Sequence, residues 1–340
     1  MIVRTQRCRT FGSEVKIADE RPGEIGMDGV AVCICTYRRP AQLSRLLASL
    51  ARMACPPSTA FVVVDNDGAD PAVRDEVVKF REMSAARVEY VVEPEPGISA
   101  ARNAALAKAR WLGAGAVAML DDDEWASPGW LTSLMQTRDA TGAGVVGGPV
   151  RPVFPASRQA LRRYERLWTI RQGSLDGRLY VSCTCNCLVD LSAVAFLGDR
   201  PFPMEFGLTG GEDAVFFRRL HRAGVPMAWS EEALLFEEIS DERASLSWMR
   251  RRWYRQGNVG VRCERAAPHG LSPLLKTLLL CARLPPYPLF NRRAFSAPVL
   301  WLLESDRVRG RIASHLGLVF KEYGRPVSDR QSAPEAENWR

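Results

Sequence analysis

The sequence predicts an α/β fold with a Rossmann-like, mostly parallel central sheet flanked by helices. From Val30 onward, short apolar runs alternate with longer stretches whose apolar residues recur at helical spacing, which is typical of a parallel sheet covered by helices. Acidic residues follow directly on two of these runs, and open α/β sheets bind ligands at the carboxyl ends of their strands. The length of 340 residues, 46% of them hydrophobic, suffices for one large domain and a smaller appendage.

The first half of the chain contains four expected strands and two expected helices. Leucines on one face mark the first helix, and Pro40 fits its first turn. The second helix is alanine-rich, and we expect Ser99 to cap its start. The strands are expected at 30–35, 61–64, 88–92 and 117–120, and the helices at 42–53 and 99–112.

The second half is less regular, and a helical, basic tail follows it. We expect helices at 130–137, 213–223 and 240–256, strands at 145–150 and 182–189, and an irregular basic segment at 151–180. The pattern divides the chain into a flexible N-terminal extension (1–28), a main domain (29–265) and a C-terminal region (266–340) that is disordered at its end. The leucine and arginine clusters of this region predict helices that lie on an anionic membrane surface or pack on the main domain.

The net charge, the number of cysteines and the hydropathy of the sequence indicate where in the cell the protein is expected. The net charge of +7 permits phosphate-rich partners of several classes. Nine cysteines cannot all pair, which favours a reducing cytosol, and we expect Cys183, Cys185 and Cys187 to be packed small residues because no histidine lies near them in the sequence to complete a zinc site. The sequence shows neither a secretory signal nor an apolar run of membrane-spanning length. The prediction is a cytoplasmic protein, with peripheral contact to the inner face of the plasma membrane as the alternative.

Two groups of acids carry the predicted chemistry. Asp121, Asp122 and Asp123 follow a buried strand, and like carboxylates held together raise one another's pKa unless a cation such as Mg²⁺ or Mn²⁺ neutralises them. Glu212 and Asp213 open a later helix, where a carboxylate can accept the proton of an acceptor hydroxyl. The alternatives are a solvated acidic turn for the first group and helix capping for the second.

Five motifs in this order resemble the family 2 inverting glycosyltransferases of the GT-A fold, and within that family the bacterial transferases of exopolysaccharide assembly, such as the succinoglycan glucosyltransferases. The resemblance covers about residues 29–265. The motifs are Cys35-Thr-Tyr-Arg-Arg-Pro40, Val64-Asp65-Asn66, Gly97-Ile-Ser-Ala-Ala-Arg-Asn103, Leu120-Asp-Asp-Asp-Glu-Trp125 and Gly210-Gly-Glu-Asp213.

The resemblance implies a role for each matching residue. Thr36, Tyr37 and Arg38 would line the nucleobase, Asp65 would accept a hydrogen bond from the base, and Arg102 would lie near the nucleotide. Asp121 and Asp123 would hold a Mn²⁺ or Mg²⁺ ion, with Asp122 in the same nucleotide-binding turn. Asp213 would be the general base, with Glu212 nearer the acceptor. The implied partners are a nucleotide-sugar donor, of the UDP-sugar class in this interpretation, and a carbohydrate or lipid-linked acceptor.

One motif departs from related polymerising synthases. Their Gln-x-x-Arg-Trp motif is represented by Arg252-Trp253, but Met249 occupies the Gln position, which argues against a processive synthase. The cluster Arg250, Arg251, Arg252 and Arg255 either closes over the diphosphate or forms a solvated helix face, whereas Trp248, Met249 and Trp253 are expected in the core.

Other functions fit the sequence less well. A dinucleotide-dependent oxidoreductase and a sugar nucleotidyltransferase would both need a glycine-rich turn after the first strand, and a P-loop kinase would need Gly-x-x-x-x-Gly-Lys-Ser/Thr. The basic residues form no recognisable nucleic-acid motif, so no nucleic-acid partner is predicted. The nucleotidyltransferase and a catalytically inactive nucleotide-binding protein of the same fold remain the alternatives.

Overall fold

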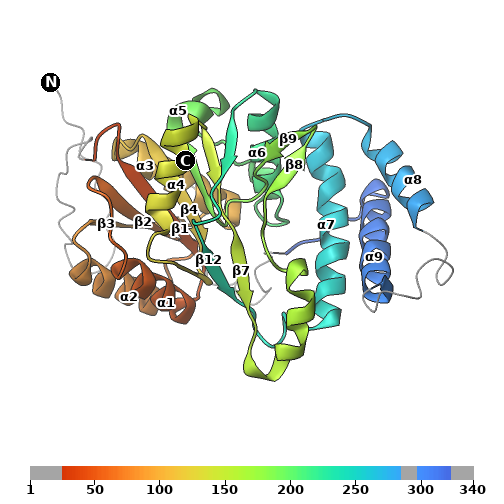
Figure 1. Cartoon of the computed structure of the whole chain (residues 1–340), viewed down its shortest axis with the longest axis horizontal. Helices are drawn as coiled ribbons and strands as arrows, with labels where there is room; N and C mark the ends of the chain where they lie inside the picture. Colours follow the sequence, from red (N-terminus) through yellow and green to blue (C-terminus); the bar gives the residue numbers. More distant parts are fainter. Residues whose placement is uncertain (1–24, 285–296, 323–340) are drawn as a thin grey trace, which may run out of the picture.

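The computed structural model describes residues 25–284 and 297–322 (Figure 1). Most of the predicted N-terminal extension, residues 1–24, and the predicted disordered end lie outside the described residues. The same holds for residues 285–296 of the basic C-terminal region.

A seven-stranded sheet forms the centre of the molecule in the order β11-β6-β10-β4-β1-β2-β3. Strand β10 runs antiparallel to both of its neighbours, and the other pairings are parallel, which confirms the predicted fold class. The register pairs Thr36 with Asp65 and Cys35 with Asp121, so the acids that follow β2 and β4 reach the same edge of the sheet. The strands are β1 (Val30–Thr36), β2 (Thr59–Asp65), β3 (Arg87–Val92), β4 (Ala116–Asp121), β6 (Val145–Gly147), β10 (Cys187–Asp190) and β11 (Met227–Trp229).

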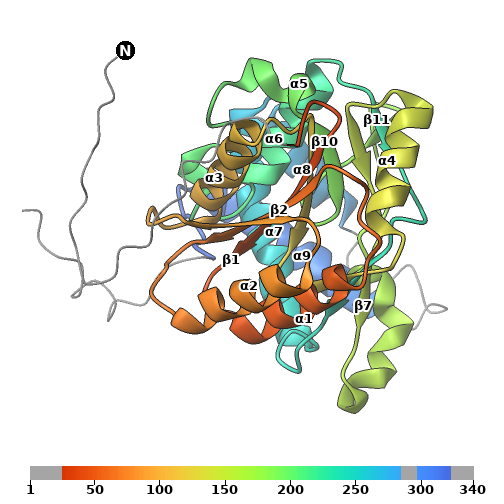
Figure 2. The same ribbon diagram turned by 90° about the vertical axis from the view of Figure 1, so that its left-hand side faces the viewer.

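Helices cover both faces of this sheet. Figure 2 shows α1 and α2 on one side of β1 and β2, and α3 on the other. Apolar side chains of α1 (Pro40–Ala51), α2 (Pro71–Met83) and α4 (Trp130–Thr141) fill one core. Those of α3 (Ile98–Trp111), α5 (Leu191–Val194) and α6 (Glu212–Arg222) fill the other.

Two details of the first half differ from the sequence prediction. Helix α2 was not assigned, although its buried residues Val73, Val77 and Phe80 have helical spacing. The prediction that Ser99 caps α3 was wrong. Gly97, at φ 119°, is the N-cap residue, and the Ser99 hydroxyl instead donates to the carbonyl of Pro203 at 2.8 Å.

The predicted strand at 145–150 is two strands in two sheets. Its second part belongs to β7 (Val150–Val153), which joins β12 (Leu235–Glu238) and β5 (Glu124–Ala126) in a small sheet. The predicted strand at 182–189 is shorter, since only β10 forms. The segment expected to be irregular contains a 3₁₀ helix η1 (Ala156–Leu167) and a hairpin of β8 (Gly173–Leu175) and β9 (Arg178–Tyr180). Short 3₁₀ turns η2 (Ala195–Leu197) and η3 (Met204–Phe206) precede α6.

Three helices complete the described chain: α7 (Leu246–Ala266), α8 (Pro273–Arg283) and α9 (Ala297–His315). Helix α9 runs beside α7 (Figure 1), and glycines permit their close approach. A Cβ atom on Gly257 would lie 1.9 Å from the carbonyl oxygen of Arg307, and one on Gly310 would lie 1.9 Å from that of Tyr254. Within the described ranges, no helix is both long and apolar enough to cross a membrane.

Candidate active site

The turn after β4 separates its acids into buried and accessible ones. Asp122 is only 5% exposed, and its carboxylate accepts from the Thr36 hydroxyl at 2.8 Å and from Arg39 Nη1 at 3.1 Å. Burial raises the pKa of Asp122 to about 6, although Arg39 opposes the shift. Glu124 is also buried, and it accepts from the backbone N–H of Asp121 at 2.8 Å. Asp122 and Glu124 therefore hold the turn in place.

Asp121 and Asp123 are the more accessible acids of this turn. Their side chains are 43% and 19% exposed. Partial desolvation of the carboxylate raises the pKa of Asp121, the positive charge of Arg102 lowers it, and the charges of Asp123 and Asp213 raise it further. The three aspartates therefore lie within electrostatic reach of one another, although they come from β4 and α6. They are called the acid cluster below.

Arg102 connects the two acidic motifs from helix α3. Its guanidinium pairs with Glu212 and bonds Asp121 Oδ1 at 3.3 Å. Burial alone would lower the pKa of Arg102, but the charges of Glu212, Asp121 and Asp213 outweigh it and raise that pKa. Arg102 stays charged, so it can offset negative charge at the cluster.

The start of α6 places Glu212 and Asp213 differently. Gly211 adopts φ 99° at the N-cap position, and a Cβ atom there would lie 2.3 Å from Val259 Cγ1, so only glycine permits this close start beside α7. Glu212 is buried, and burial raises its pKa to about 7 although Arg102 opposes the shift. Asp213 is half-buried and accepts from the backbone N–H of Ala214 at 2.6 Å. Of the two acids, Asp213 is the one that solvent can reach.

The predicted nucleobase residues lie at the same sheet edge. Asp65 is buried, and its carboxylate accepts from the Tyr90 hydroxyl at 2.7 Å and from the backbone N–H of Asp67 at 3.1 Å. Arg38 is exposed and pairs with Asp67 at 2.5 Å. Thr36 is buried against Asp122, and Tyr37 is half-buried. The structure thus brings the strand-one and strand-two motifs together at the edge that carries the acid cluster.

Sequence reasoning missed Arg243, which lies beside Asp123 near the predicted Arg252. Arg243 donates to Asp123 Oδ2 at 2.9 Å and pairs with Glu237 of β12. The guanidinium of Arg252 lies 5.2 Å from the ring centre of Trp248, which also stacks on Arg243 at 5.1 Å. Among the described residues, Arg252 Nη1 is buried without a hydrogen-bond partner, and burial lowers the pKa of Arg252. No motif indicated Arg243, since only the fold brings it to β4.

The predicted arginine cluster on α7 separates into different contacts. Arg250 pairs with Asp306 of α9, and Arg255 pairs with Glu322, so both form ion pairs with the C-terminal region. Arg252 is the member beside Glu237 and Arg243. Met249 is buried in a core that Trp248 and Trp253 also contact, as predicted. In the cysteine run, the Cys185 thiol donates to Cys183 Sγ at 3.0 Å, and Cys187 is buried.

The acid cluster fits a divalent cation. Carboxylate oxygens are the ligands that Mg²⁺ and Mn²⁺ prefer, and the negative charges of Asp123 and Asp213 already raise the pKa of Asp121. The arginines offset this charge only in part: Arg102 bonds Asp121, and Arg243 bonds one oxygen of Asp123. A cation between Asp121 and Asp123 would remove the remaining repulsion.

Comparison with solved structures identifies the fold as that of the GT-A glycosyltransferases. The mannosyltransferase PcManGT from Pyrobaculum calidifontis, in complex with GDP-Man and Mn²⁺, superimposes with a TM-score of 0.56 at 15% identity over 88% of each chain. The S. aureus protein TarS (residues 1–349), in complex with UDP-GlcNAc, has a TM-score of 0.50 at 14% identity and covers 85% of this chain and 92% of its own.

Sequence comparison identifies the family. Residues 31–197 match the family model described as glycosyl transferase family 2. The succinoglycan biosynthesis protein ExoM of Rhizobium meliloti (strain 1021) is 36% identical over 244 residues, which are 71% of this chain and 77% of the relative. The validoxylamine A glucosyltransferase of Streptomyces hygroscopicus subsp. limoneus is 31% identical over 235 residues, 60% of this chain and 50% of that protein. The chain belongs to glycosyl transferase family 2, and its activity is that of a glycosyltransferase.

Proposed function

We propose that the protein is an inverting transferase that moves a sugar from a nucleotide-diphosphate sugar, of the UDP-sugar class, to an acceptor hydroxyl in bacterial polysaccharide or glycoconjugate biosynthesis. The main support is that acids of two remote motifs lie side by side, since Arg102 bonds both Asp121 and Glu212. The relatives support the pathway class, since one is named a succinoglycan biosynthesis protein and another a glucosyltransferase. The solved neighbours were bound to GDP-Man with Mn²⁺ and to UDP-GlcNAc.

The donor would bind along the sheet edge. Thr36, Tyr37 and Arg38 would line the nucleobase, and Asp65 would accept a hydrogen bond from it, because these residues end β1 and β2 at the edge that carries the cluster. Asp121 and Asp123 would hold a Mn²⁺ or Mg²⁺ ion, which would bind the diphosphate oxygens and offset their charge. Asp122 would act through the backbone of the turn, because Thr36 and Arg39 already bond its carboxylate.

The arginines beside Asp123 would bind the diphosphate from the other side. Arg252 is buried, and one of its nitrogen atoms has no hydrogen-bond partner in the described part of the chain. A buried positive charge without a hydrogen-bond partner is unfavourable. A phosphate oxygen beside this nitrogen would supply both the hydrogen bond and a compensating negative charge. Arg243 would then exchange its bond with Asp123 for one with phosphate oxygen, freeing that carboxylate for the cation.

Asp213 would act as the general base. It would take the proton of the acceptor hydroxyl while the acceptor oxygen bonds the anomeric carbon from the face opposite the diphosphate. The bond between the anomeric carbon and the diphosphate oxygen breaks with its electron pair leaving on that oxygen, so the product is inverted and a nucleoside diphosphate is released. Glu212 would hold Arg102 in place and lie nearer the acceptor.

We also propose that the division at 265/266 separates the transferase domain from a tail that contacts an anionic membrane. Helix α8 exposes Leu274, Leu275, Leu278 and Leu279 by 40–56%, a spacing that puts them on one face, while Thr277 on the opposite face is buried. Basic residues Lys276 and Arg283 and the net charge of +7 complement an anionic surface. A lipid-linked acceptor at the cytoplasmic face of the plasma membrane would suit this placement.

A donor screen tests the proposed function. The protein is incubated with UDP-, TDP- and GDP-glucose, each with and without Mn²⁺, and released nucleoside diphosphate and free sugar are quantified, with water as the acceptor. We expect metal-dependent release from UDP-glucose, and proton NMR should show the inverted anomer first. A retained anomer, or no release from any donor under conditions where the donors bind, would overturn the mechanism and favour a catalytically inactive homologue.

A further inference from the structure

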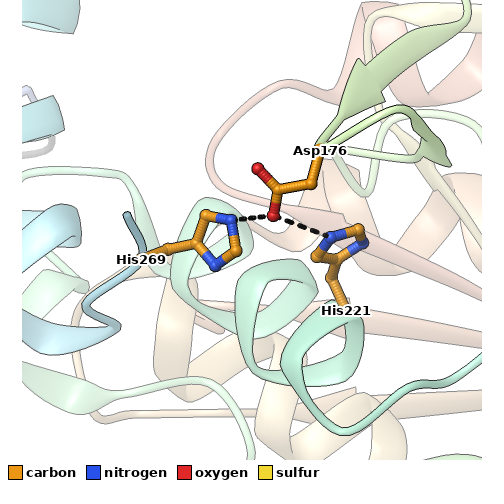
Figure 3. Close-up of side chains that lie close together, drawn as sticks. All are labelled: Asp176, His221 and His269. Carbon is orange, nitrogen blue, oxygen red and sulfur yellow. Dashed lines mark ion pairs between the residues drawn. The ribbon is translucent and has the colours of Figure 1, made fainter. Parts of the chain in front are cut away.

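Two of the chain's three histidines meet at one carboxylate outside the acid cluster (Figure 3). Asp176 lies in the turn between β8 and β9, His221 near the end of α6, and His269 between α7 and α8. Asp176 Oδ2 is 3.9 Å from His221 Nε2 and also pairs with His269 Nε2. The three ligand atoms all lie within 4.8 Å of one another.

We propose that Asp176, His221 and His269 bind a divalent transition-metal ion such as Zn²⁺, in a site separate from the acid cluster. Two imidazole nitrogens and one carboxylate oxygen, with water as a fourth ligand, are a common donor set for zinc. Tetrahedral bonds of about 2.0–2.2 Å place ligand atoms about 3.3–3.6 Å apart. The distance between His221 and Asp176 exceeds that range by a few tenths of an ångström, and Asp176 and His269 lie closer together than that range. The exposed side chain of Asp176 would therefore shift toward His221 when an ion binds.

The imidazole rings are held in place before any ion binds. The His221 side chain is 3% exposed, and its ring packs edge-on against Tyr180 with 5.6 Å between ring centres. The His269 ring packs in the same manner against His221 at 5.8 Å.

Arg178 competes for this site. One of its nitrogen atoms lies 3.1 Å from His221 Nε2 and 3.4 Å from the carbonyl oxygen of His221. A bound cation would displace this guanidinium, which can turn to solvent because Arg178 is exposed. Removing the positive charge of Arg178 should therefore strengthen metal binding, whereas removing a ligand should weaken it. A simple ion-pair network would not produce these opposite effects.

The bound ion would have a structural role. It would join the β8–β9 hairpin, the end of α6 and the segment after α7, which are separate in the sequence. Helix α6 begins with Glu212, and Asp213 is eight residues before His221, about 12 Å along the helix axis. The ion would thus anchor the far end of the helix that carries the proposed base, without touching the reacting atoms. This inference does not depend on the identity of the donor.

Zinc titration of the chelator-treated protein, with excess Mg²⁺ to occupy the acid cluster, tests the inference. We expect one Zn²⁺ per chain and a rise in Tm on binding. Asp176→Asn and His269→Ala should each lower the affinity for Zn²⁺ at least about tenfold, and Arg178→Gln should raise it. The matched control is His315→Gln, which changes the third histidine and should leave zinc affinity unaltered.

Cobalt(II) gives a second measurement that does not depend on folding stability. Bound by two imidazoles and a carboxylate in a tetrahedral site, it should absorb strongly in the visible range, and the absorption should be lost in His269→Ala. Equal zinc affinity in the wild type, Asp176→Asn and His269→Ala would overturn the proposal. So would a zinc affinity that Arg178→Gln leaves unchanged or lowers.

Discussion

At the scale of single residues, the direction in which each acidic side chain points decides its role in the turn at the end of β4. Asp122 and Glu124 turn inward and hold the turn through Thr36, Arg39 and the backbone of Asp121. Asp121 and Asp123 remain available to ligands. Neighbouring aspartates therefore differ in their expected response to the same substitution.

Substitution of the proposed base separates binding from chemistry. Asp213→Asn keeps the size of the side chain but removes the proton acceptor, so sugar transfer should fall about 10²–10⁴-fold. The Kd for UDP in the presence of Mn²⁺ should change less than about threefold, measured by calorimetry beside a transfer assay. Asp199→Asn, at an exposed position, is the control. Ordinary turnover in Asp213→Asn with donor binding intact would show that another group accepts the proton.

Asp122→Asn should change the pH dependence of stability. The native pKa of Asp122, about 6, exceeds its ordinary value of 3.8, so the native state binds this proton more tightly than the unfolded chain does. The free energy of unfolding of the wild type should fall by up to about 3 kcal/mol, relative to that of the variant, as the pH rises from about 4 to 6. Urea unfolding across pH 4–8 without divalent cations measures this loss, and a constant difference would contradict the assignment. Metal-dependent nucleotide binding should survive in the variant.

At the scale of elements, the contact between α7 and α9 depends on backbone proximity. Gly257→Ala would force a Cβ atom against the carbonyl of Arg307 and should lower the free energy of unfolding by about 1–3 kcal/mol. Gly260→Ala in the same helix is the control, because its nearest neighbour would be Arg311 Nη1 at 3.7 Å. That change should be neutral or stabilise by up to about 1 kcal/mol. If both substitutions change the free energy of unfolding equally, as measured with denaturant, the close packing of α7 on α9 would be contradicted.

The exposed face of α8 makes a separate prediction. The wild type should sediment with anionic phosphatidylglycerol vesicles and not with neutral phosphatidylcholine vesicles. Leu274→Glu combined with Leu278→Glu should weaken this binding at least about tenfold, because both leucines would enter the bilayer boundary. Met83→Glu, an equally exposed apolar position on α2, is the control. Self-association of the wild type through this face, detected by light scattering, with no vesicle binding, would contradict membrane docking.

Helices and strands with a clear pattern of apolar residues could be predicted from the sequence, whereas short elements could not. The leucines of α1 and the apolar runs of β1, β2 and β4 identified these elements to within a few residues. The apolar run at 145–150 gave no sign of its division between β6 and β7, because both parts are apolar and only strand pairing separates them. Ser99 was a reasonable cap, but the backbone of Gly97 starts α3 earlier.

At the scale of the whole molecule, the fold assembles one site from segments separated by more than a hundred residues. Motif residues from β1, β4, α3 and α6 meet at the carboxyl edge of the sheet, and each was identified in the sequence. Arg243 and Glu237 were not, because no motif marks them and their place depends on the pairing of β12 in the small sheet. The meeting of Asp176 with His221 and His269 likewise depends on tertiary packing.

The proposed function depends on the acid cluster forming a metal-dependent site for a nucleoside diphosphate. Calorimetric titration of UDP, with and without Mn²⁺, on the wild type and on Asp123→Asn tests it most directly. UDP should bind the wild type in the presence of Mn²⁺, and its affinity should fall at least about tenfold when either the metal or the Asp123 carboxylate is removed. UDP binding that is unaffected by both removals, or no UDP binding with Mn²⁺ present, would contradict it.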